Sequence, residues 1–412
     1  MTDFYDDLEL RDPGQRDKSL FAALPEHIAH AKNNTPFFGS LLEDIDPRSI
    51  SDRAALSTIP VTRKSDLIAL QKQDAPFGGM TTVAPGRLGR IFSSPGPIYD
   101  PQGATGDFWR FGRALWAAGF RRGDIVHNTF SYHFTPAGLM VDLGAQAIGC
   151  AVFPAGVGQT EMQLQTIADV RPDGYAGTPS FLKILLEKAD ELKTNVSSIK
   201  KALVSGEALL PAVRDMLKDR GLNVRQCYGT ADLGLIAYES EPNAGLIVDE
   251  GVIVEIVRPG SNDPVAEGEV GEVVVTNLAS EYPLIRFGTG DLSAILAGQS
   301  PCGRTNARIK GWMGRADQTA KVKGMFVHPS QINQIAARHS QVVRARLTID
   351  HDQQSNDRMA LQCESDAIDE TLAAAIADSI REITKLRGAV KFVAIGSLPN
   401  DGKVIDDLRK FD

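Results

Sequence analysis

Hydrophobic positions change their spacing several times along this chain, and the changes mark out its elements. In residues 1–90 apolar side chains recur at helical spacing, as in SLFAALPEHIAHAKN at 19–33 and in the helix–turn–helix pattern DRAALSTIPVTRKSDLIAL at 52–70. From Phe108 onward, short apolar runs bounded by glycine and proline alternate with helical patterns. This alternation predicts a sheet with parallel strands that are connected by helices.

The alternating region contains a regular series of strand and helix candidates. Strands are expected within 123–130, 149–156, 172–179, 201–206 and 223–229, and helices within 108–120, 136–147, 180–192 and 210–221. Ligands of such sheets bind beyond the carboxyl ends of the strands. We therefore expect the chemistry in the loops AGTPS at 176–180, SGEALLP at 205–211 and YGTADLG at 228–234.

The pattern changes twice more toward the C-terminus. After Gly245, the runs VIVEIV, GEVVVTNL and PLIRFGTGDLSAIL are separated by glycine-rich turns, which indicates an antiparallel sheet or a small barrel. Past Asp317, strands at 344–350 and 358–365, a helix at 367–388 and a final strand at 390–399 indicate a small domain. The predicted fold class is α/β, with a large N-terminal domain, residues 1–316, of mixed sheets flanked by helices, and a small α+β C-terminal lid domain, residues 317–412.

Length and charge narrow the class of partner. The chain has 412 residues, which is more than one hydrophobic core supports. Its net charge of -8 does not fit nucleic-acid binding, which relies on clustered Lys and Arg, and favours a small-molecule partner. The acidic N-terminus lacks the pattern of a secretory signal, and no run of about 20 apolar residues could span a membrane. We expect a cytoplasmic protein without membrane contact, and leave homodimer formation open.

Three short motifs carry candidate chemistry, and each also has a plainer interpretation. In QCYGTADLGLIAYES at 226–240, the backbone amides of 229–231 would face a phosphate and Asp232 would offer a carboxylate to Mg²⁺; the alternative is strand, turn and strand. In RFGTGDLSAI at 286–295, Asp291 would accept hydrogen bonds from ribose hydroxyls; the alternative is a hairpin turn. Lys403, in the sequence GK near the C-terminus, is either catalytic or an ordinary surface charge.

In combination and in this order, the motifs resemble the adenylate-forming superfamily of acyl-CoA synthetases. The YG turn with its carboxylate, the TGD, the GRAD followed by KVKG, and the terminal GK all occur. The stretches TPFFGSLL, IPVTRKSDL, GQTEMQLQTIADVRPDGYAGTPSFL and KVKGMFVHPSQI are similar to the phenylacetate-CoA ligase branch, over nearly the whole chain. The resemblance implies an ATP-dependent ligase that activates an aromatic or other small carboxylic acid as its acyl-adenylate and transfers it to coenzyme A.

The resemblance also implies roles for individual residues. Asp317 would be a hinge about which the small domain rotates, and Lys403 would be the catalytic residue that bridges ATP and carboxylate oxygens during adenylation. Asp232 would hold Mg²⁺. The implied nucleotide-binding residues are Ser93, Ser94, Ser205, Gly206, Glu207, Tyr228, Gly229, Thr230, Asp232, Asp291 and Arg315, and the implied acyl-binding residues are Tyr132, His133, Phe134 and Ala208.

The chain also departs from the family pattern. Its phosphate loop reads FSSPGPIYDPQG at 92–103, where prolines remove amide donors and stiffen the backbone. Residue 231 is Ala where a hydroxyl residue is usual, and the positions of a zinc-binding Cys and His correspond to Ser240 and Ile247, so no zinc is expected. His133 is interpreted as a packed histidine in preference to a polar contact.

The stiff phosphate loop keeps two alternatives open. In the first, the acyl group passes to a carrier-protein thiol or an amine. In the second, the chain binds nucleotide or acyl-adenylate without turning it over.

Overall fold

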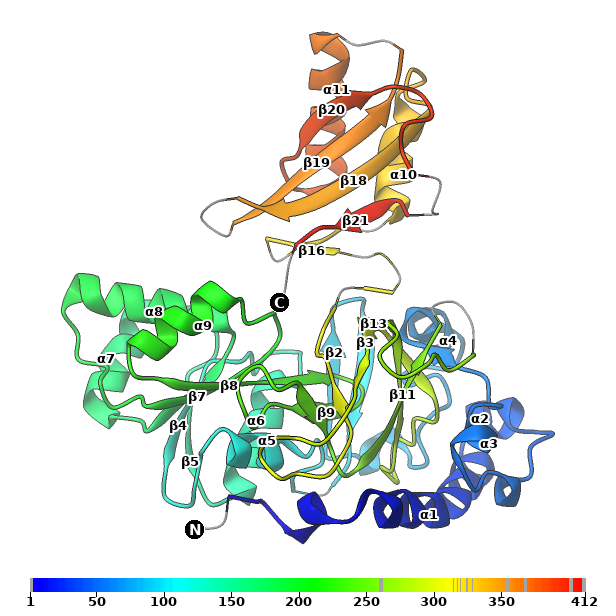
Figure 1. The fold of residues 1–412 in the computed structure, drawn as a ribbon, viewed down its shortest axis with the longest axis vertical. Coiled ribbons are helices and arrows are strands. Elements are labelled where there is room, and N and C mark those ends of the chain that lie inside the picture. The colour runs from blue at the N-terminus through cyan, green and yellow to red at the C-terminus, as the bar shows by residue number, and fades with distance from the viewer. Residues whose placement is uncertain are drawn as a thin grey trace. The chain divides into compact units, whose positions relative to one another are not determined.

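The structure is a computed structural model, and it divides into two compact units, Met1–Trp312 and Met313–Asp412. It describes residues 3–104, 106–258, 262–313, 315–316, 318, 320–323, 325–327, 329–352, 356–366, 369–399 and 403–409. The predicted hinge, Asp317, lies outside these residues. Each unit has its own sheets (Figure 1). Each also has its own hydrophobic core.

The large unit is built on a nine-stranded mixed sheet with the order β14-β15-β10-β9-β8-β7-β6-β4-β5. All five strands that the sequence predicts in its parallel half are present. They are β4 (Ile125–Asn128), β5 (Ala151–Pro154), β6 (Gly174–Gly177), β7 (Lys201–Val204) and β8 (Asn223–Thr230). The antiparallel half consists of β9 (Gly234–Tyr238), β10 (Leu246–Val248), β15 (Arg308–Ile309) and β14 (Ile295–Leu296).

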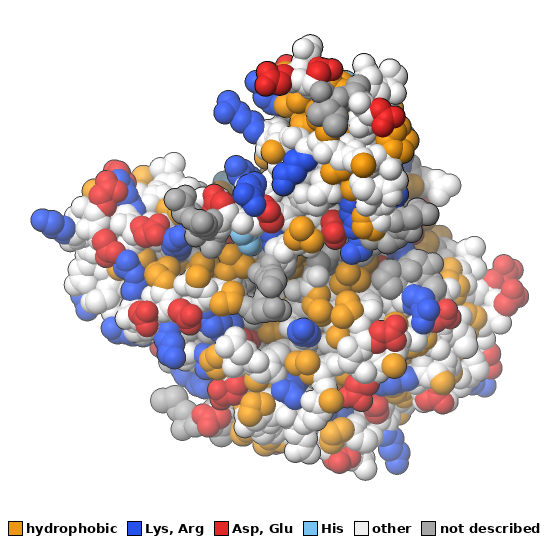
Figure 2. Space-filling model, turned by 45° about the horizontal axis from the view of Figure 1, so that its top comes forward, with side chains coloured by type: hydrophobic (Ala, Val, Ile, Leu, Met, Phe, Trp, Pro, Cys, Tyr) orange, Lys and Arg blue, Asp and Glu red, His pale blue; other side chains and the backbone are white. Residues whose placement is uncertain are grey.

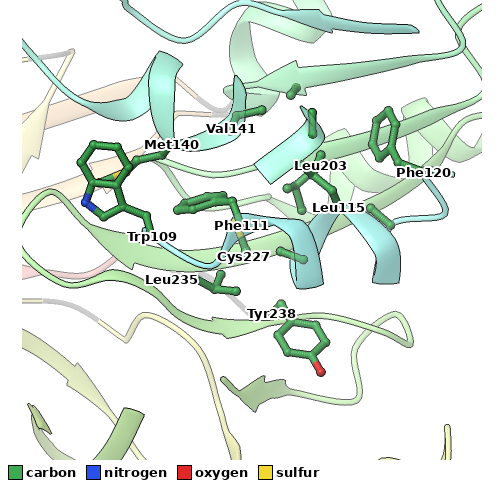
Figure 3. Close-up of a cluster of buried hydrophobic side chains, with 14 of the residues drawn as sticks. Trp109, Phe111, Leu115, Phe120, Met140, Val141, Leu203, Cys227, Leu235 and Tyr238 are labelled. Carbon is green, nitrogen blue, oxygen red and sulfur yellow. The ribbon is translucent and has the colours of Figure 1, made fainter. Parts of the chain in front are cut away.

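Helices connect the parallel strands, as the alternating pattern predicts. They are α6 (Ala137–Ala147), α7 (Thr160–Val170), α8 (Pro179–Leu192) and α9 (Pro211–Asp219), of which α7 was not predicted, and α5 (Phe111–Ala117) precedes β4. Local sequence fixes where α8 begins: the Thr178 side chain accepts a hydrogen bond from the amide of Phe181, and Pro179 fills the first helical position. The apolar sides of α5 and α6 pack on β8 and β9, where Phe111, Cys227 and Leu235 lie close together in one buried cluster (Figure 3).

A second sheet of four strands packs against the other face of β8 and β9. Its order is β1-β13-β12-β11, with β1 (Thr62–Arg63), β11 (Val252–Val257), β12 (Gly271–Asn277) and β13 (Phe287–Ser293). β11, β12 and β13 are antiparallel, as predicted, and β1 adds in parallel to β13. Because neighbouring residues of a strand point to opposite faces, Cys227 faces the α5 and α6 cluster while Tyr228 faces the second sheet.

The N-terminal residues are helical and cover the second sheet. They form α1 (Pro13–Asn34), α2 (Pro36–Leu41), α3 (Arg53–Leu56) and α4 (Leu67–Gln73), with short 3-10 turns η1 (Asp7–Leu10), η2 (Pro47–Ser49), η3 (Lys64–Asp66) and η4 (Pro85–Arg87). Apolar residues of α1 and α2 share one buried cluster with Ile253 and Ile285. A separate hairpin, β2 (Arg90–Ser94) and β3 (Ile98–Gln102), follows η4.

The small unit has a four-stranded sheet with the order β20-β19-β18-β21, packed on two helices. It contains β16 (Ala320–Val322), β17 (Met325–Val327), α10 (Pro329–Arg338), β18 (Arg344–His351), β19 (Asp357–Glu364), α11 (Glu370–Thr384), β20 (Ala389–Val393) and β21 (Ile405–Asp407). The prediction of one final strand at 390–399 is wrong. β20 stops at Val393 because the chain turns at Gly396, which has a positive φ of 81°, and β21 follows later.

The surface carries both signs of charge. In Figure 2 acidic and basic side chains are interspersed over the visible face. Within the described ranges, no helix is both long enough and apolar enough to cross a membrane.

Candidate active site

Tyr228 and Asp291, which the sequence assigns to one nucleotide site, are in direct contact. The Tyr228 hydroxyl donates to Oδ2 of Asp291 at 2.8 Å and also lies 3.2 Å from the hydroxyl of Thr289. The contact exists because Tyr228 leaves β8 on the face that meets β13. The indole Nε1 of Trp312 donates to the other Asp291 oxygen at 3.0 Å. Sequence analysis did not single out Thr289 or Trp312.

Asp232 is buried and paired with a lysine that sequence analysis did not select. Its Oδ2 lies 2.6 Å from the Lys64 Nζ, and its residue exposure is 3%. Burial opposes the charge on Lys64, but the carboxylates of Asp232, Asp100 and Asp291 outweigh it and raise the pKa of Lys64. Only the family-like stretch IPVTRKSDL pointed to this region, and nothing in it distinguished Lys64 from a surface lysine.

The proline-containing segment forms a tight hairpin where the sequence comparison places the phosphate loop. Ser94 pairs with Ile98, so only residues 95–97 form the turn. The hairpin is fixed at two points: Gln71 of α4 exchanges two hydrogen bonds of 2.8 Å with the Tyr99 backbone, and the Ser93 amide donates to the Phe134 carbonyl at 2.8 Å. Ser93 is half-buried and Ser94 is buried.

Asp100 of this hairpin is fully buried and close to the Lys64–Asp232 pair. Neither of its carboxylate oxygens forms a well-aligned hydrogen bond, although the side chains of Ser94 and Asp232 are close enough to interact with it. Burial and the charge of Asp232 raise the pKa of Asp100 well above its usual value, and the Lys64 ammonium opposes this effect in part. The sequence gave no sign that this carboxyl would be enclosed.

Three of the four predicted acyl-binding residues, Tyr132, His133 and Phe134, follow β4 in one turn. Tyr132 is anchored: its hydroxyl donates to Oδ2 of Asp142 at 3.0 Å and accepts from Asn128 at 2.7 Å. Phe134 leaves 81% of its surface exposed. The interpretation of His133 as a packed histidine is wrong, because the residue lies exposed at the tip of the turn.

The SGEA loop after β7 connects two neighbouring strand ends. The Ser205 hydroxyl donates to the Cys227 carbonyl at 2.8 Å, and the Glu207 carboxylate accepts from the Ser180 amide at 2.7 Å, at the N-terminus of α8. Gly206 has a φ of 83° and lies near Phe130, while Ala208 is half-buried beside it in the chain. The loop is therefore held at the carboxyl edge of the parallel strands, where the fold class predicts a ligand.

Gly229 and Thr230 are the last residues of β8. They pair with Leu235 and Gly234 of β9, so the local structure of this segment is strand, turn and strand. The Thr230 hydroxyl accepts from the Leu233 amide at 3.2 Å, which fixes the turn that carries Asp232.

The remaining predicted residues belong to the small unit. The Lys403 side chain is 54% exposed, and its ammonium lies 3.3 Å from Oδ1 of Asp406. Arg315 is half-buried. Their roles, like that of Asp317, stay predictions.

Comparison with known proteins identifies the family to which this arrangement belongs. The family model for the AMP-binding enzyme matches residues 107–280. A phenylacetate-coenzyme A ligase of Thermus thermophilus is 32% identical over 336 residues, which cover 77% of this chain and 74% of that protein. This chain belongs to the phenylacetate-coenzyme A ligase family.

A second curated relative and a solved structure are also similar to this chain. The phenylacetate-coenzyme A ligase of Escherichia coli K12 is 30% identical over 325 residues, which cover 74% of this chain and 72% of that protein. A crystal structure of 2-hydroxyisobutyryl-CoA ligase with 2-HIB-AMP and CoA has a TM-score of 0.79 and 23% identity, over 100% of this chain and 93% of that one, and supports the fold. As a member of the family, the chain is an AMP-forming acyl-CoA ligase that uses ATP, coenzyme A and a small acid and works through an acyl-adenylate.

The contact between Tyr228 and Asp291 gives a testable prediction. If Asp291 binds the ribose, Asp291→Asn removes a charged acceptor worth about 1.5–3 kcal/mol, so the Kd for AMP should rise roughly 10- to 100-fold in calorimetry. Asp215→Asn, which changes an exposed carboxylate on α9, is the matched control and should leave the Kd unchanged. A folded Asp291→Asn protein with the original Kd would remove Asp291 from the ribose site.

Proposed function

We propose that the chain activates an aromatic carboxylic acid with ATP and passes the acyl group to coenzyme A. The observation that carries this proposal is the junction of Tyr228, Asp291 and the Lys64–Asp232 pair between the two sheets, in a member of the phenylacetate-coenzyme A ligase family. These residues offer acceptors for ribose hydroxyls and a cation for phosphate within one site.

The reaction has two steps. First, a carboxylate oxygen of the acid attacks the α-phosphorus of ATP; the bond to the bridging oxygen breaks, and pyrophosphate leaves. Second, the thiol sulfur of coenzyme A attacks the carbonyl carbon of the acyl-adenylate, AMP leaves, and the thiol proton is released. The first step is needed because a free carboxylate is a poor acylating agent.

Two lysines of this chain would stabilise negative charge in the first step. Lys64 supplies positive charge near the phosphates, which matters because the β2–β3 hairpin contains no lysine. Lys403, delivered by the small unit, would bridge the α-phosphate and the attacking carboxylate. Rotation at Asp317 would then withdraw Lys403 before the thiol arrives.

Asp232 fits the role of a Mg²⁺ ligand. Its Oδ1 is buried and has no hydrogen-bond partner, and carboxylate oxygens are the ligands that Mg²⁺ prefers. When bound, the ion would neutralise charge on the phosphates. The residues Tyr228 and Thr230 would position the nucleotide around it.

An aromatic acid is favoured by the residues around the SGEA loop and the β4 turn. Phe130 lies near Gly206, and Tyr132 is held in a fixed orientation by Asn128 and Asp142. Aromatic rings bury large apolar surfaces and pack against one another in defined geometries. The names of the relatives at 29–32% identity also specify an aryl acid.

Pyrophosphate exchange over a panel of acids tests the proposal. We expect exchange with arylacetic or benzoic acids to exceed exchange with aliphatic acids of equal carbon number by about tenfold or more, because the ring gains apolar burial. Consumption of free coenzyme A in the same samples distinguishes a CoA ligase from an enzyme that uses a carrier protein or an amine. Exchange that is stronger with aliphatic acids would contradict the aromatic assignment.

The β2–β3 hairpin favours a second candidate function, in which the chain binds nucleotide without turning it over. Its turn of residues 95–97 contains two prolines and so offers few amide donors to a pyrophosphate group. Calorimetry that shows tight ATP binding, together with no exchange across the whole panel, would select this candidate.

A further inference from the structure

The Tyr132 hydroxyl has both a donor and an acceptor partner inside the protein. Its oxygen accepts from Nδ2 of Asn128 at 2.7 Å, and it donates its proton to Oδ2 of Asp142 at 3.0 Å. Asn128 is fully buried, and Asp142 is 9% exposed. Sequence analysis singled out neither of these two residues. The far end of the Tyr132 side chain is therefore held by two enclosed polar groups.

The surroundings of Asn128 determine the direction of these hydrogen bonds. Its Nδ2 also donates to the Gly138 carbonyl at 2.8 Å, and its Oδ1 accepts from the Phe130 amide at 3.2 Å. A carbonyl can only accept and a backbone amide can only donate, so the Asn128 side chain has one orientation, in which both Nδ2 protons are used. Burial and the charge of Asp142 raise the pKa of Tyr132. The phenol thus keeps its proton and directs it to Asp142.

Asp142 is itself held in place on α6. Nε2 of Gln146, one helical turn later, donates to Oδ1 of Asp142, so each carboxylate oxygen has a donor. Met140 and Val141, the two preceding residues of α6, belong to the buried cluster (Figure 3). Because close-packed cores resist displacement, α6 offers Tyr132 a fixed acceptor.

The Tyr132 ring packs directly on the backbone of Gly138. A Cβ atom at position 138 would lie 2.9 Å from Cγ and from Cδ2 of the ring, whereas non-bonded carbon atoms pack at about 3.5–4.0 Å. Glycine therefore allows the ring to lie against the start of α6. Tyr132 is only half-buried, so part of its ring stays open to a ligand.

We propose that Asp142 is a positioning residue for the acid: by holding the Tyr132 hydroxyl, it fixes the Tyr132 ring as a rigid apolar wall of the acyl site. Tyr132 contacts the acid in the proposed function, on which this inference rests. Because the hydroxyl proton is already donated to Asp142, Tyr132 meets the acid with its ring. A wall that is fixed before binding loses little conformational entropy when the acid arrives.

Equilibrium dialysis of labelled phenylacetic acid and benzoic acid against the full chain, with AMP present, measures this effect without turnover. Asp142→Ala and Tyr132→Phe should each raise the Kd for the acid by about three- to tenfold, the cost of ordering one side chain on binding. The double variant should bind no more weakly than the weaker single variant, because both changes break the same hydrogen bond. If the hydroxyl contacted the acid directly, the two effects would multiply.

Controls separate positioning from a general loss of structure. Asp169→Ala removes the carboxylate of another Gln–Asp pair with four-residue spacing, on the exposed face of α7, and should leave the Kd unchanged. Asp142→Ala should keep the wild-type Kd for AMP, and should raise the KM for the acid while kcat changes by less than about twofold. Should Asp142→Ala fail to fold in circular dichroism, Tyr132→Phe, which keeps the shape of the ring, carries the test.

Three results would overturn the inference: an acid Kd that neither variant changes, effects that multiply in the double variant, or an equal loss of affinity for AMP. Failure of the proposed function gives a different pattern. Acid binding that depends on Asp142 without any pyrophosphate exchange contradicts the ligase reaction alone, and exchange with an unchanged KM in Asp142→Ala contradicts the positioning role alone. Wild-type protein that binds neither acid contradicts both.

Discussion

Lys403→Ala is expected to lower the rate of pyrophosphate exchange by about 10²–10³-fold, the usual effect of removing one preorganised group that stabilises transition-state charge. During adenylation negative charge spreads over the α-phosphate and the leaving pyrophosphate, and an ammonium at that point stabilises it. Lys403 is 54% exposed and paired with Asp406, so its loss should not unfold the small unit. Exchange is measured with labelled pyrophosphate at saturating acid.

Two controls make this result specific. Lys391→Ala removes another exposed lysine of the small unit, on β20, and should leave exchange unchanged. Lys403→Ala supplied with a preformed acyl-adenylate should still make the thioester, because the second step needs no ammonium at the phosphates. An unchanged exchange rate in a folded Lys403→Ala protein would refute the role of Lys403 and the moving-domain scheme with it.

Arg286→Met is expected to lower the free energy of unfolding of the large unit by about 3–5 kcal/mol, the usual cost of breaking a buried ion pair from one side. Arg286 is fully buried, and its Nε lies 3.0 Å from the Glu255 carboxylate. Its other nitrogens donate to the carbonyls of Ser57, Ile59 and Asn262. Arg286 thus joins the segment before β1 to β11 and β13.

Loss of the guanidinium leaves Glu255 in a site that opposes its charge. Burial already raises the pKa of Glu255, and the Arg286 charge is what counteracts that effect. Guanidinium chloride unfolding followed by tryptophan fluorescence measures the change, since all three tryptophans lie in residues 1–312.

Two further variants test whether the effect of Arg286→Met comes from its buried ion pair with Glu255. Arg220→Met, which breaks a surface pair with Asp190, should cost at most about 1 kcal/mol. The double variant Glu255→Met with Arg286→Met should recover part of the loss, because it removes the unpaired charge. A cost for Arg286→Met no larger than that for Arg220→Met would show that the pair does not hold the second sheet.

Much of the large unit could be predicted from local pattern alone. Apolar runs bounded by glycine and proline correctly located β4 through β8, because these signals act within a few residues of one another. The predicted helix start at Ser180 lies one residue past Pro179, where α8 begins. The prediction failed where an apolar run continued on both sides of a glycine turn. The strand predicted at 390–399 ended early at Val393, since the turn at Gly396 outweighed the apolar pattern.

In the candidate site, too, one contact could be predicted from the sequence and another could not. Motif order placed Tyr228 and Asp291 in one site, and the structure brings their side chains to 2.8 Å. Motif order did not indicate that Lys64 would contact Asp232, because 168 residues separate the two in the chain. A lysine that neutralises a buried carboxylate has the same local sequence as a lysine in solvent.

By itself, the sequence determined the alternation of strands and helices, the family of the chain and the identity of most candidate residues, because spacing and motif order are properties of neighbouring positions. Tertiary structure decided which charges are enclosed. The packing of the second sheet on β8, and of α4 on the β2–β3 hairpin, removes Asp100, Asp232 and Tyr282 from water. Burial depends on segments that meet only in the folded chain, and it is burial that raises the pKa of the Asp100 carboxyl well above its usual value.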